Sequence, residues 1–511
     1  MLLDRDTVLS TSGQDSLAFT KSVLKLLNDW TSEGFIYSGI DSITVFEDTV
    51  SWYAHQGDRF QWDQIHIQSE DSSISYDVKS SPNKVLTKYA DSGYPFSRLF
   101  CQELSTNGDE ITATFMIDMG PQISFDSVQI QGELSIRQGP LHKILGVQPG
   151  AFYQESVFKG IKARVESVPF IALKTEPDIG FSDQKATVYL EVESVKAGRF
   201  DGIVGLVPSP PGSDRSSQLN GFFDLALPNL FNAAIDFNAY WSAFGTNSQK
   251  IALSSSAPHL TTLGLGIEAA FDLIRQDTTF LNQSFRVSLL SRIGTRSKIS
   301  FGYRRQNSIE QGSFSELIRP FQYAWYQFSY RSNTPLFAFE RSSGFSYQFD
   351  ASVGDRRLLE EEVNRRSLSL QSTGRLSLSQ KIFNKALFYT SSSAGLLINE
   401  QGLVNNELYR IGGTNSVRGF IENELFASSY FYQNIEFRQY IDQGSYLWLF
   451  TDQGAYRNLE KSTRFLSSAG IGLALRTDAG RFNLIFATGT EWNNIAPSFT
   501  SLVHFGYSAT F

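Results

Sequence analysis

The sequence is poor in cysteine and has no long apolar run. Cys101 is the single cysteine among 511 residues, which excludes a disulfide within the chain and a zinc–thiolate cluster. No segment approaches the ~18 uninterrupted apolar residues that a transmembrane helix requires. Residues 1–10 lack the basic start and the apolar core of a secretory leader. For an exported barrel, either a leader was removed before numbering, or the assigned start is wrong, or the barrel interpretation fails; we favour the first two.

Charged residues are also scarce and unevenly distributed. They make up 19% of the chain, below the ~25% of typical soluble domains. Residues 1–197 carry an excess of acidic side chains, whereas residues 198–511 are close to balance. An acidic front half argues against nucleic acid as a partner, because its phosphates require the opposite charge.

Motifs of enzymes are missing too. The chain has no Gly-x-Ser-x-Gly nucleophile elbow and no Gly-Lys-Ser/Thr phosphate loop. Its five histidines are scattered without the spacing of metal ligands. We therefore expect no enzymatic activity, no catalytic residue, no metal and no cofactor.

Aromatic residues, in contrast, are abundant, at 14% of the chain, while the mean hydropathy is only −0.20. From Gly198 onward, segments of 9–16 residues alternate polar and apolar side chains between polar turns. In a transmembrane barrel, lipid-facing and lumen-facing residues alternate and average out in this way. We predict sixteen antiparallel strands, starting near residues 199, 218, 230, 248, 260, 277, 295, 321, 335, 365, 383, 425, 445, 463, 480 and 499. A helical signal remains only at 356–366.

The parity of two predicted strands supports a barrel. In the last strand, Val503, Phe505, Tyr507, Ala509 and Phe511 fall on one face and polar or small residues on the other. In the strand near 425–441, Glu436 and Arg438 share a face opposite Phe437. A charge facing lipid at mid-depth costs about 2–4 kcal/mol. The face with Glu436 and Arg438 is therefore predicted to point into the lumen.

The front half repeats a short pattern. Residues 57–68 match residues 120–131 at an offset of 63, which indicates small modules in series. Helical spacing precedes hairpin-like strand pairs in each module. We predict α+β modules at 59–120 and 121–197. A partial or truncated module is expected at 1–58, without a clear opening strand.

One long predicted loop, residues 399–424, carries the most specific motif. Its tip reads Val417-Arg418-Gly419-Phe420 and follows Gly412-Gly413. A later strand reads Phe450-Thr451-Asp452-Gln453-Gly454, and the chain ends on the aromatic segment with Phe505, Tyr507 and Phe511. This ordered set resembles the outer-membrane assembly and translocation superfamily that includes BamA, TamA and the two-partner-secretion transporters. The resemblance is specific over residues 411–511 and looser over 59–410.

The resemblance implies roles for these residues. The loop folds back into the barrel, and its Arg418 meets the lumen-facing Asp452, since a carboxylate is a bidentate partner for a guanidinium. Gly419 permits a tight turn, and Phe420 packs against the inner wall. Alternatively, the pair Arg418–Asp452 only stabilises the fold.

The first and last strands are expected to form a seam. In the superfamily these strands pair poorly and can open toward lipid, and Phe505–Phe511 resembles the terminal signal that is read during membrane insertion. Gly202, Gly205 and the prolines at 208, 210 and 211 would weaken pairing. The alternative is an ordinary turn after a normal strand.

The resemblance implies a bacterial outer-membrane protein with POTRA modules in the periplasm. The first expectation is a TamA-like role in inserting other outer-membrane proteins, with POTRA edges receiving unfolded clients by strand addition. Its partners would be the outer-membrane bilayer, those clients and a periplasmic or inner-membrane accessory protein. One alternative is a two-partner-secretion transporter, although residues 1–13 show neither the plug helix nor the proline-rich linker that is usual in such transporters. The other alternative is a passive pore or receptor.

Overall fold

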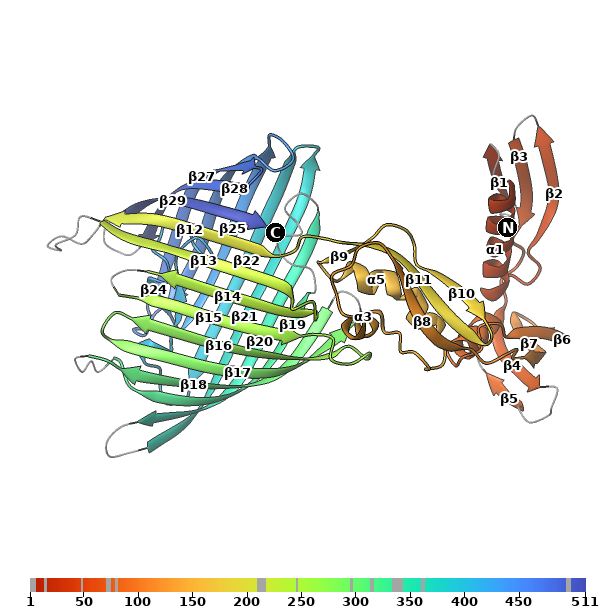
Figure 1. The fold of residues 1–511 in the computed structure, drawn as a ribbon, viewed down its shortest axis with the longest axis horizontal. Coiled ribbons are helices and arrows are strands. Elements are labelled where there is room, and N and C mark those ends of the chain that lie inside the picture. The colour runs from red at the N-terminus through yellow and green to blue at the C-terminus, as the bar shows by residue number, and fades with distance from the viewer. Residues whose placement is uncertain are drawn as a thin grey trace. The chain divides into compact units, whose positions relative to one another are not determined.

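The computed structural model describes residues 6–12, 16–46, 49–69, 75–78, 81–208, 217–244, 247–294, 297–312, 317–332, 343–359, 364–492 and 498–511. Along these residues, three small α/β modules precede a closed antiparallel β-barrel (Figure 1). No helix in this part of the chain is long and apolar enough to cross a membrane.

The first module has an opening strand, contrary to the prediction. β1 (Asp6–Ser12) is followed by α1 (Ser16–Ser32), β2 (Gly39–Phe46) and β3 (Thr49–His55), and the sheet order is β1-β3-β2. Sequence reasoning missed β1 because it is short and mostly polar. Val23 of α1 and Ala54 of β3 are buried.

The second module is a four-stranded sheet with one helix. It contains β4 (Gln61–Ser69), β5 (Ser75–Val78), α2 (Pro82–Ala90), β6 (Arg98–Asn107) and β7 (Glu110–Asp118), in the sheet order β5-β4-β7-β6. Alternate residues of β7 are buried, as expected for a strand with one covered face. They form a core with β4 and α2, made of Ile65, Ile67, Val85, Ala113, Phe115 and Ile117.

The third module contains the remaining helices of the described front half. These are α3 (Gln138–Leu145), α4 (Glu155–Lys159) and α5 (Ile161–Glu166). Its strands are β8 (Ser124–Gln131), β9 (Ile171–Leu173), β10 (Asp178–Ser182) and β11 (Lys185–Ser194). The sheet order is β10-β11-β8, with β9 also paired to β11. Each of the three sheets lies within one of the segments 1–58, 59–120 and 121–197.

The repeated sequence pattern corresponds to a repeated connection. β4 and β8 both begin four residues after a glycine with positive φ, Gly57 or Gly120. Just before each strand, the Phe60 N–H donates to the Gly34 carbonyl (2.9 Å) and the Ile123 N–H to the Gly93 carbonyl (2.8 Å). A Cβ at Gly34 would lie 1.8 Å from the Phe60 carbonyl oxygen, so the connection requires glycine there.

Sixteen strands among the described residues close the barrel (Figure 1). They are β12 (Arg199–Pro208), β13 (Ser217–Leu230), β14 (Ile235–Ala243), β15 (Gln249–Ala257), β16 (Leu265–Gln276), β17 (Phe280–Ile293), β18 (Ser297–Glu310), β19 (Phe321–Ser332), β20 (Gly344–Leu359), β21 (Asn364–Phe383), β22 (Ala386–Asn399), β25 (Ser429–Tyr440), β26 (Tyr446–Arg457), β27 (Thr463–Thr477), β28 (Gly480–Trp492) and β29 (Ser498–Thr510). Each pairs with the next along the wall, and β29 returns to β12. The predicted sixteen-stranded barrel is confirmed.

The predicted pattern and the described strands differ around the ninth strand of the barrel. The ninth strand begins at Gly344, and its predicted start near 335 falls outside the described residues. The helical signal at 356–366 is wrong, because Arg356 lies inside β20 and β21 begins at Asn364. The charged residues there imitate helical spacing, but the strand parity of β20 continues to its end, with Arg356 buried.

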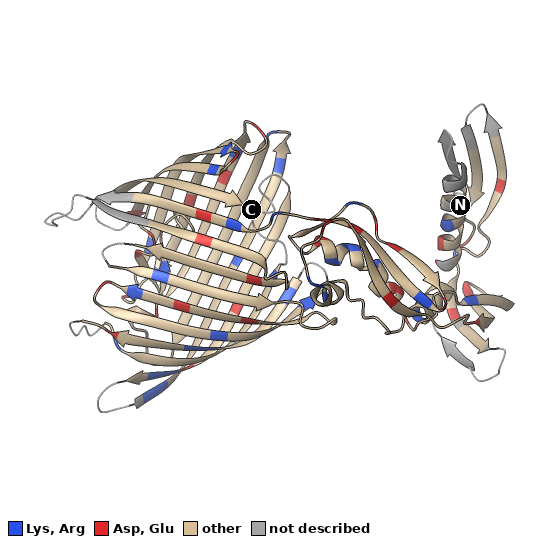
Figure 2. Cartoon of the chain, in the orientation of Figure 1, with Lys and Arg blue, Asp and Glu red and all other residues tan. Residues whose placement is uncertain are grey.

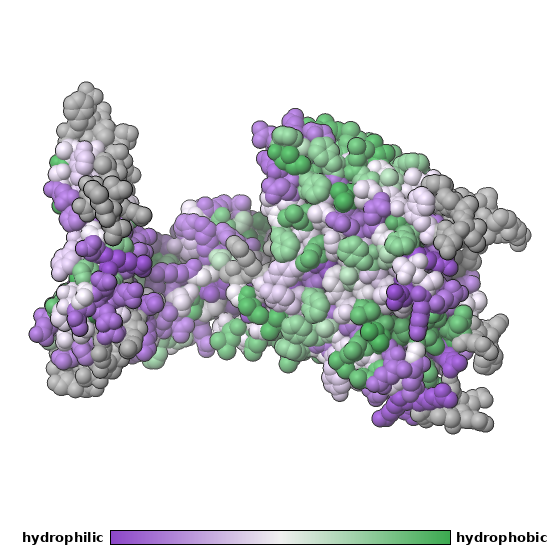
Figure 3. Space-filling model, turned by 180° about the vertical axis from the view of Figure 1, so that it is seen from behind, coloured by the Kyte–Doolittle hydropathy of each residue, from purple (hydrophilic) through white to green (hydrophobic). Residues whose placement is uncertain are grey.

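The two faces of the wall differ in polarity. Large apolar side chains such as Phe301, Leu449 and Phe505 are more than half exposed, whereas Glu436 and Asp452 are buried. Figure 3 shows apolar side chains gathered over the barrel, and Figure 2 shows long stretches of strand without charge. The predicted placement of Glu436 toward the lumen is confirmed, since its carboxylate contacts the loop enclosed by the barrel.

The first and last strands pair over a short distance. The β12–β29 register runs from Arg199↔Thr510 to Gly205↔His504, so in the described residues the rest of β29 pairs only with β28. Pro208, which has no N–H, ends β12, while the prolines at 210 and 211 lie outside the described residues. The seam is therefore closed at one end and unpaired at the other.

Candidate functional site

A long loop between β22 and β25 fills part of the barrel lumen. It contains a 3-10 turn at Asn405–Glu407 and a two-stranded ribbon of β23 (Tyr409–Ile411) and β24 (Leu425–Ala427). The loop bonds to strands on several sides of the barrel. The Asn282 amide of β17 donates to the Asn406 carbonyl (2.6 Å), and Arg375 of β21 donates to the Asn415 carbonyl (3.3 Å). Contacts on this many strands require that the loop lies inside the barrel.

The loop tip places the Arg418 guanidinium against Asp452 of β26. Its Nε donates to Asp452 Oδ2 (2.9 Å) and its Nη2 to Oδ1 (2.6 Å), which is a bidentate pair. The backbone N–H of Arg418 also donates to Oδ2 (2.9 Å). Asp452 is fully buried. The structure thus brings together the two residues that the sequence motif associated.

A second carboxylate and a second arginine complete this charge cluster. Arg418 Nη1 donates to Glu436 Oε1 (2.6 Å), and Arg438 Nε donates to Glu436 Oε2 (2.8 Å). The Arg418 guanidinium also lies 3.7 Å from the centroid of the Phe450 ring, a favourable cation–π position. Two cations therefore face two carboxylates, and every charge of the cluster has a partner.

Glycine at position 419 allows the tip to lie directly on the wall. Gly419 has φ +86, and a Cβ there would lie 2.5 Å from the backbone nitrogen of Gly489 in β28. The next residue, Phe420, is buried, and a Cβ at Gly489 would lie 2.9 Å from its ring. Phe420 thus packs on the inner wall where that wall has no side chain.

The two glycines before the tip shape a tight turn. Gly412 and Gly413 have φ +107 and +98, and the Gly413 N–H donates to the carbonyl of the fully buried Val417 (3.1 Å). Gly454, in contrast, does not belong to this turn. It lies in β26, where a Cβ would be 2.8 Å from the Phe431 carbonyl oxygen of the neighbouring strand.

A second buried ion pair holds the base of the loop and was not predicted. Arg356 Nη1 donates to both oxygens of Glu407 (3.0 Å each), and both side chains are 1% exposed. Arg356 also donates to Asn399 Oδ1 (2.6 Å) and to the Gly402 carbonyl (2.8 Å). Extending the strand parity of β20 to Arg356 would have placed it in the lumen and required an acidic partner.

The terminal aromatic residues lie on the outer face beside the seam. Phe505 is 52% exposed, and the Tyr507 ring lies 5.1 Å from that of Phe482. The exposed Phe511 exchanges backbone hydrogen bonds with Gly198 (2.9 and 3.0 Å), just before β12. The last residue therefore continues the pairing of the seam by one position.

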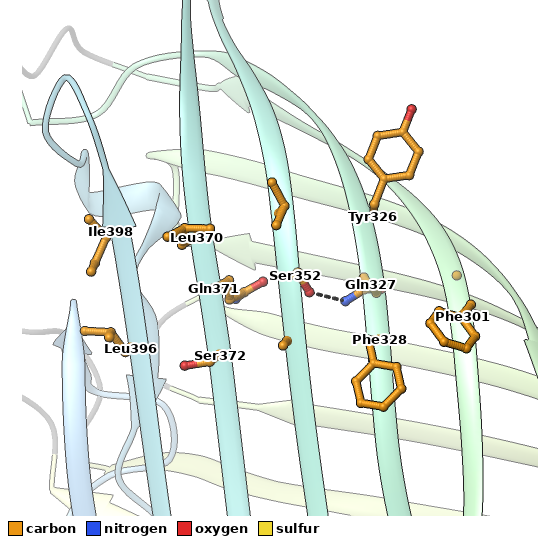
Figure 4. A pocket seen from close by; sticks show the side chains of 13 residues that line it. Phe301, Tyr326, Gln327, Phe328, Ser352, Leu370, Gln371, Ser372, Leu396 and Ile398 are labelled. Atoms are coloured by element: carbon orange, nitrogen blue, oxygen red, sulfur yellow. Dashed lines mark hydrogen bonds between the residues drawn. The ribbon is translucent and has the colours of Figure 1, made fainter.

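A hollow of about 580 Å³ lies on the wall from β18 to β22. Its exposed side chains are apolar: Phe301, Tyr326, Val353, Leu370, Leu396 and Ile398 (Figure 4). The polar residues drawn there include Gln327 and Ser352, which hydrogen-bond to each other (3.1 Å). A lipid-facing wall has this composition, and no charged group lines the hollow.

An apolar outer band, a polar lumen and sixteen closed strands define an outer-membrane β-barrel. Residues 273–477 match the model of a family described as haemolysin secretion/activation protein ShlB/FhaC/HecB. The match contains both buried ion pairs. No curated protein sequence matches the chain.

Solved structures share this fold at low sequence identity. CdiB from Escherichia coli is 14% identical with a TM-score of 0.54, covering 96% of this chain and 98% of that one. CdiB from Acinetobacter baumannii is 15% identical with a TM-score of 0.53, covering 86% and 84%. BamA from Haemophilus ducreyi lacking POTRA domains 1–3 is 14% identical with a TM-score of 0.49, covering 84% and 92%.

Proposed function

We propose that this chain is a two-partner-secretion transporter of the bacterial outer membrane, which passes a partner polypeptide through its lumen. The observation that carries the proposal is the match of residues 273–477 to a family of secretion/activation proteins. That segment includes the whole lumenal loop with Arg418, Asp452, Arg356 and Glu407. The ribbon of the loop, β23–β24, is a two-stranded sheet separate from the barrel sheet, so the loop can leave the lumen without breaking the strand pairing of the wall.

The expected TamA-like insertion role gives way to this alternative. The secretion/activation match favours transport, whereas transport was ranked second only because residues 1–13 show neither a plug helix nor a proline-rich linker. The proposed partner is still an unfolded polypeptide in the periplasm, and comparing the polypeptides released by cells with and without this chain would identify it.

We further propose that the three α/β modules are POTRA modules in the periplasm and that β6 is a receiving edge. β6 is an edge strand, and nearly all of its side chains are exposed. Among them, Phe100 and Leu104 are 52% and 44% exposed. An edge with unpaired backbone groups and exposed apolar side chains suits strand addition by an extended chain.

The single cysteine tests this edge directly. Cys101 lies on β6 and is exposed, so a bulky maleimide reacts at one position of the chain. Labelling should reduce export of the partner severalfold, because the adduct obstructs pairing along β6. The Cys101→Ser variant, treated identically, should export normally. Unchanged export after complete labelling would rule out β6 as the receiving edge.

Two disulfide traps separate transport from insertion. In a Cys101→Ser background, the first trap joins Val204 to Phe505, which are opposite each other in the seam. The second joins Ser416 of the loop to Asn434 of β25, whose amide donates to the Ser416 carbonyl (2.7 Å). Transport through the lumen predicts that the loop trap stops export, that reduction restores it, and that the seam trap leaves it intact.

The readouts are the partner in the culture medium and the folded state of other outer-membrane barrels. The partner is first identified as a polypeptide that cells lacking this chain fail to release. A seam trap that blocks barrel assembly, with export unaffected by the loop trap, would favour insertion instead.

A further inference from the structure

A polar cavity of about 300 Å³ lies between the lumenal loop and the barrel wall. The wall contributes residues of β15 to β19, β21 and β22, and the loop contributes residues 406–410 and Asn423. Three cationic side chains line it, namely Lys250, Arg304 and Arg410, against one carboxylate, Glu407. The charge of the lining is therefore predominantly positive.

Arg410 extends from β23 into surroundings without an acidic contact. Its guanidinium lies near three aromatic rings, with centroids at 4.5 Å for Phe426, 5.3 Å for Phe280 and 5.8 Å for Phe244. Nη1 donates to Gln276, but the buried Nη2 has no hydrogen-bond partner within the described residues. A buried N–H without an acceptor costs about 1–3 kcal/mol, more for a charged group, so Nη2 is available to donate to a bound acceptor.

Arg304 of β18 also has a guanidinium nitrogen without a hydrogen-bond acceptor in the described residues. Its Nη2 donates to Gln371 (2.6 Å) and its guanidinium lies 5.2 Å from the Trp325 ring, yet its buried Nε has no acceptor in the described part of the chain. Arg286, itself paired with Glu268 (3.0 Å), adds repulsion to Arg304. An anion in the cavity would accept a hydrogen bond from Arg304 Nε and would offset the repulsion from Arg286.

The acidic groups nearby are engaged elsewhere. Glu407 is held by Arg356 at 3.0 Å. Glu422 accepts the Thr414 N–H (3.2 Å) and interacts with Lys250. Asp272 accepts a hydroxyl from Ser284 (3.4 Å) and acts on Arg304 only through space. None of them supplies a hydrogen bond to Arg304 or Arg410.

We propose that Arg304 and Arg410 bind a phosphate group in this lumenal cavity. Arg304 Nε and Arg410 Nη2 each have a buried N–H that a phosphate oxygen can accept, and a dianion balances both cations, whereas a monocarboxylate leaves one uncompensated. This proposal does not rest on the proposed transport function, because the phosphate site would exist whatever polypeptide the barrel handles.

The test is calorimetric titration of the full chain in detergent with inorganic phosphate, at constant chloride. The wild-type chain should bind phosphate, and Arg410→Gln and Arg304→Gln should each weaken the affinity at least tenfold. The matched control is Arg305→Gln, at the next position on the same strand, where the side chain is exposed. It should bind as wild type. Glycerol phosphate, tested separately, distinguishes a site that takes phosphate esters, as in lipid headgroups, from one restricted to the free ion.

Folding of each variant is checked by its mobility on gels before and after heating. If an arginine variant misfolds, the Asp272→Asn variant tests the proposal instead. Removing this negative charge should tighten phosphate binding severalfold. The proposal is overturned if the wild type gives no binding heat with either phosphate compound. It is equally overturned if folded Arg410→Gln retains wild-type affinity, or if Asp272→Asn leaves the affinity unchanged.

Discussion

The Arg418→Ala variant should lose about 3–5 kcal/mol of stability in the loop-bound state and, because less folded barrel remains, should reduce export of the proposed partner. The substitution leaves Asp452, which is fully buried, without its bidentate partner. Glu436 still forms its ion pair with Arg438 at 2.7 Å, so Asp452 is the carboxylate that loses its cationic partner. Limited proteolysis of the loop in detergent, together with urea unfolding of the barrel, measures the effect. Faster cleavage within residues 400–428 is the expected sign of a released loop.

A double variant separates pairing from side-chain loss. Arg418→Ala with Asp452→Ala removes both charges and should be less unstable than the sum of the single variants, since no buried charge is left alone. If this pair only stabilises the fold, export should follow barrel stability and recover in the double variant. Export that stays lost in a stable double variant assigns the pair a part in transport. Wild-type loop protection in Arg418→Ala would contradict the lock itself.

The Glu407→Gln variant should cost about as much, again about 3–5 kcal/mol. The amide has nearly the same shape, but it leaves the Arg356 guanidinium, 1% exposed, without a counter-charge. Tyr323 and the Val404 N–H, which both bond to Glu407 (3.1 Å each), also lose a charged acceptor. The barrel should unfold at lower urea concentration, and the loop should be cut more readily near residue 404.

Glu400→Gln is the matched control for this second pair. Glu400 belongs to the same loop and is exposed, and its Oε2 accepts the Leu368 N–H (3.1 Å). An amide oxygen can still accept that bond, so stability should change by less than about 0.5 kcal/mol. Equal losses in Glu400→Gln and Glu407→Gln would show that burial of the Arg356 pair contributes nothing.

Sequence reasoning succeeded where a pattern is local. Strand alternation of period two predicted the number of barrel strands correctly, because the strands of the wall have one apolar and one polar face. The loop tip was identified from contiguous letters around Arg418, and the carboxylate of Asp452 from a second contiguous motif.

The parts that were missed depend on contacts between distant residues. Arg356 and Glu407 are 51 positions apart in different elements, and neither stands in a motif. The absence of acidic contacts around Arg410 likewise follows only from the folded lumen. β1 was missed because it is short and mostly polar, and only its pairing with β3 in the folded module identifies it as a strand.

The unequal pairing around the wall determines the order in which the barrel comes apart. The β12–β29 ladder ends at Gly205↔His504, whereas the β17–β18 ladder is continuous from Phe280↔Glu310 to Ile293↔Ser297. Under mechanical load we therefore expect the β12–β29 seam to separate before the β17–β18 pair. Arg356, which anchors the loop, lies in β20, and the ladder of β20 with β21 runs from Gly344↔Ser379 to Leu359↔Asn364, so we expect this part of the wall to stay joined after the seam has opened.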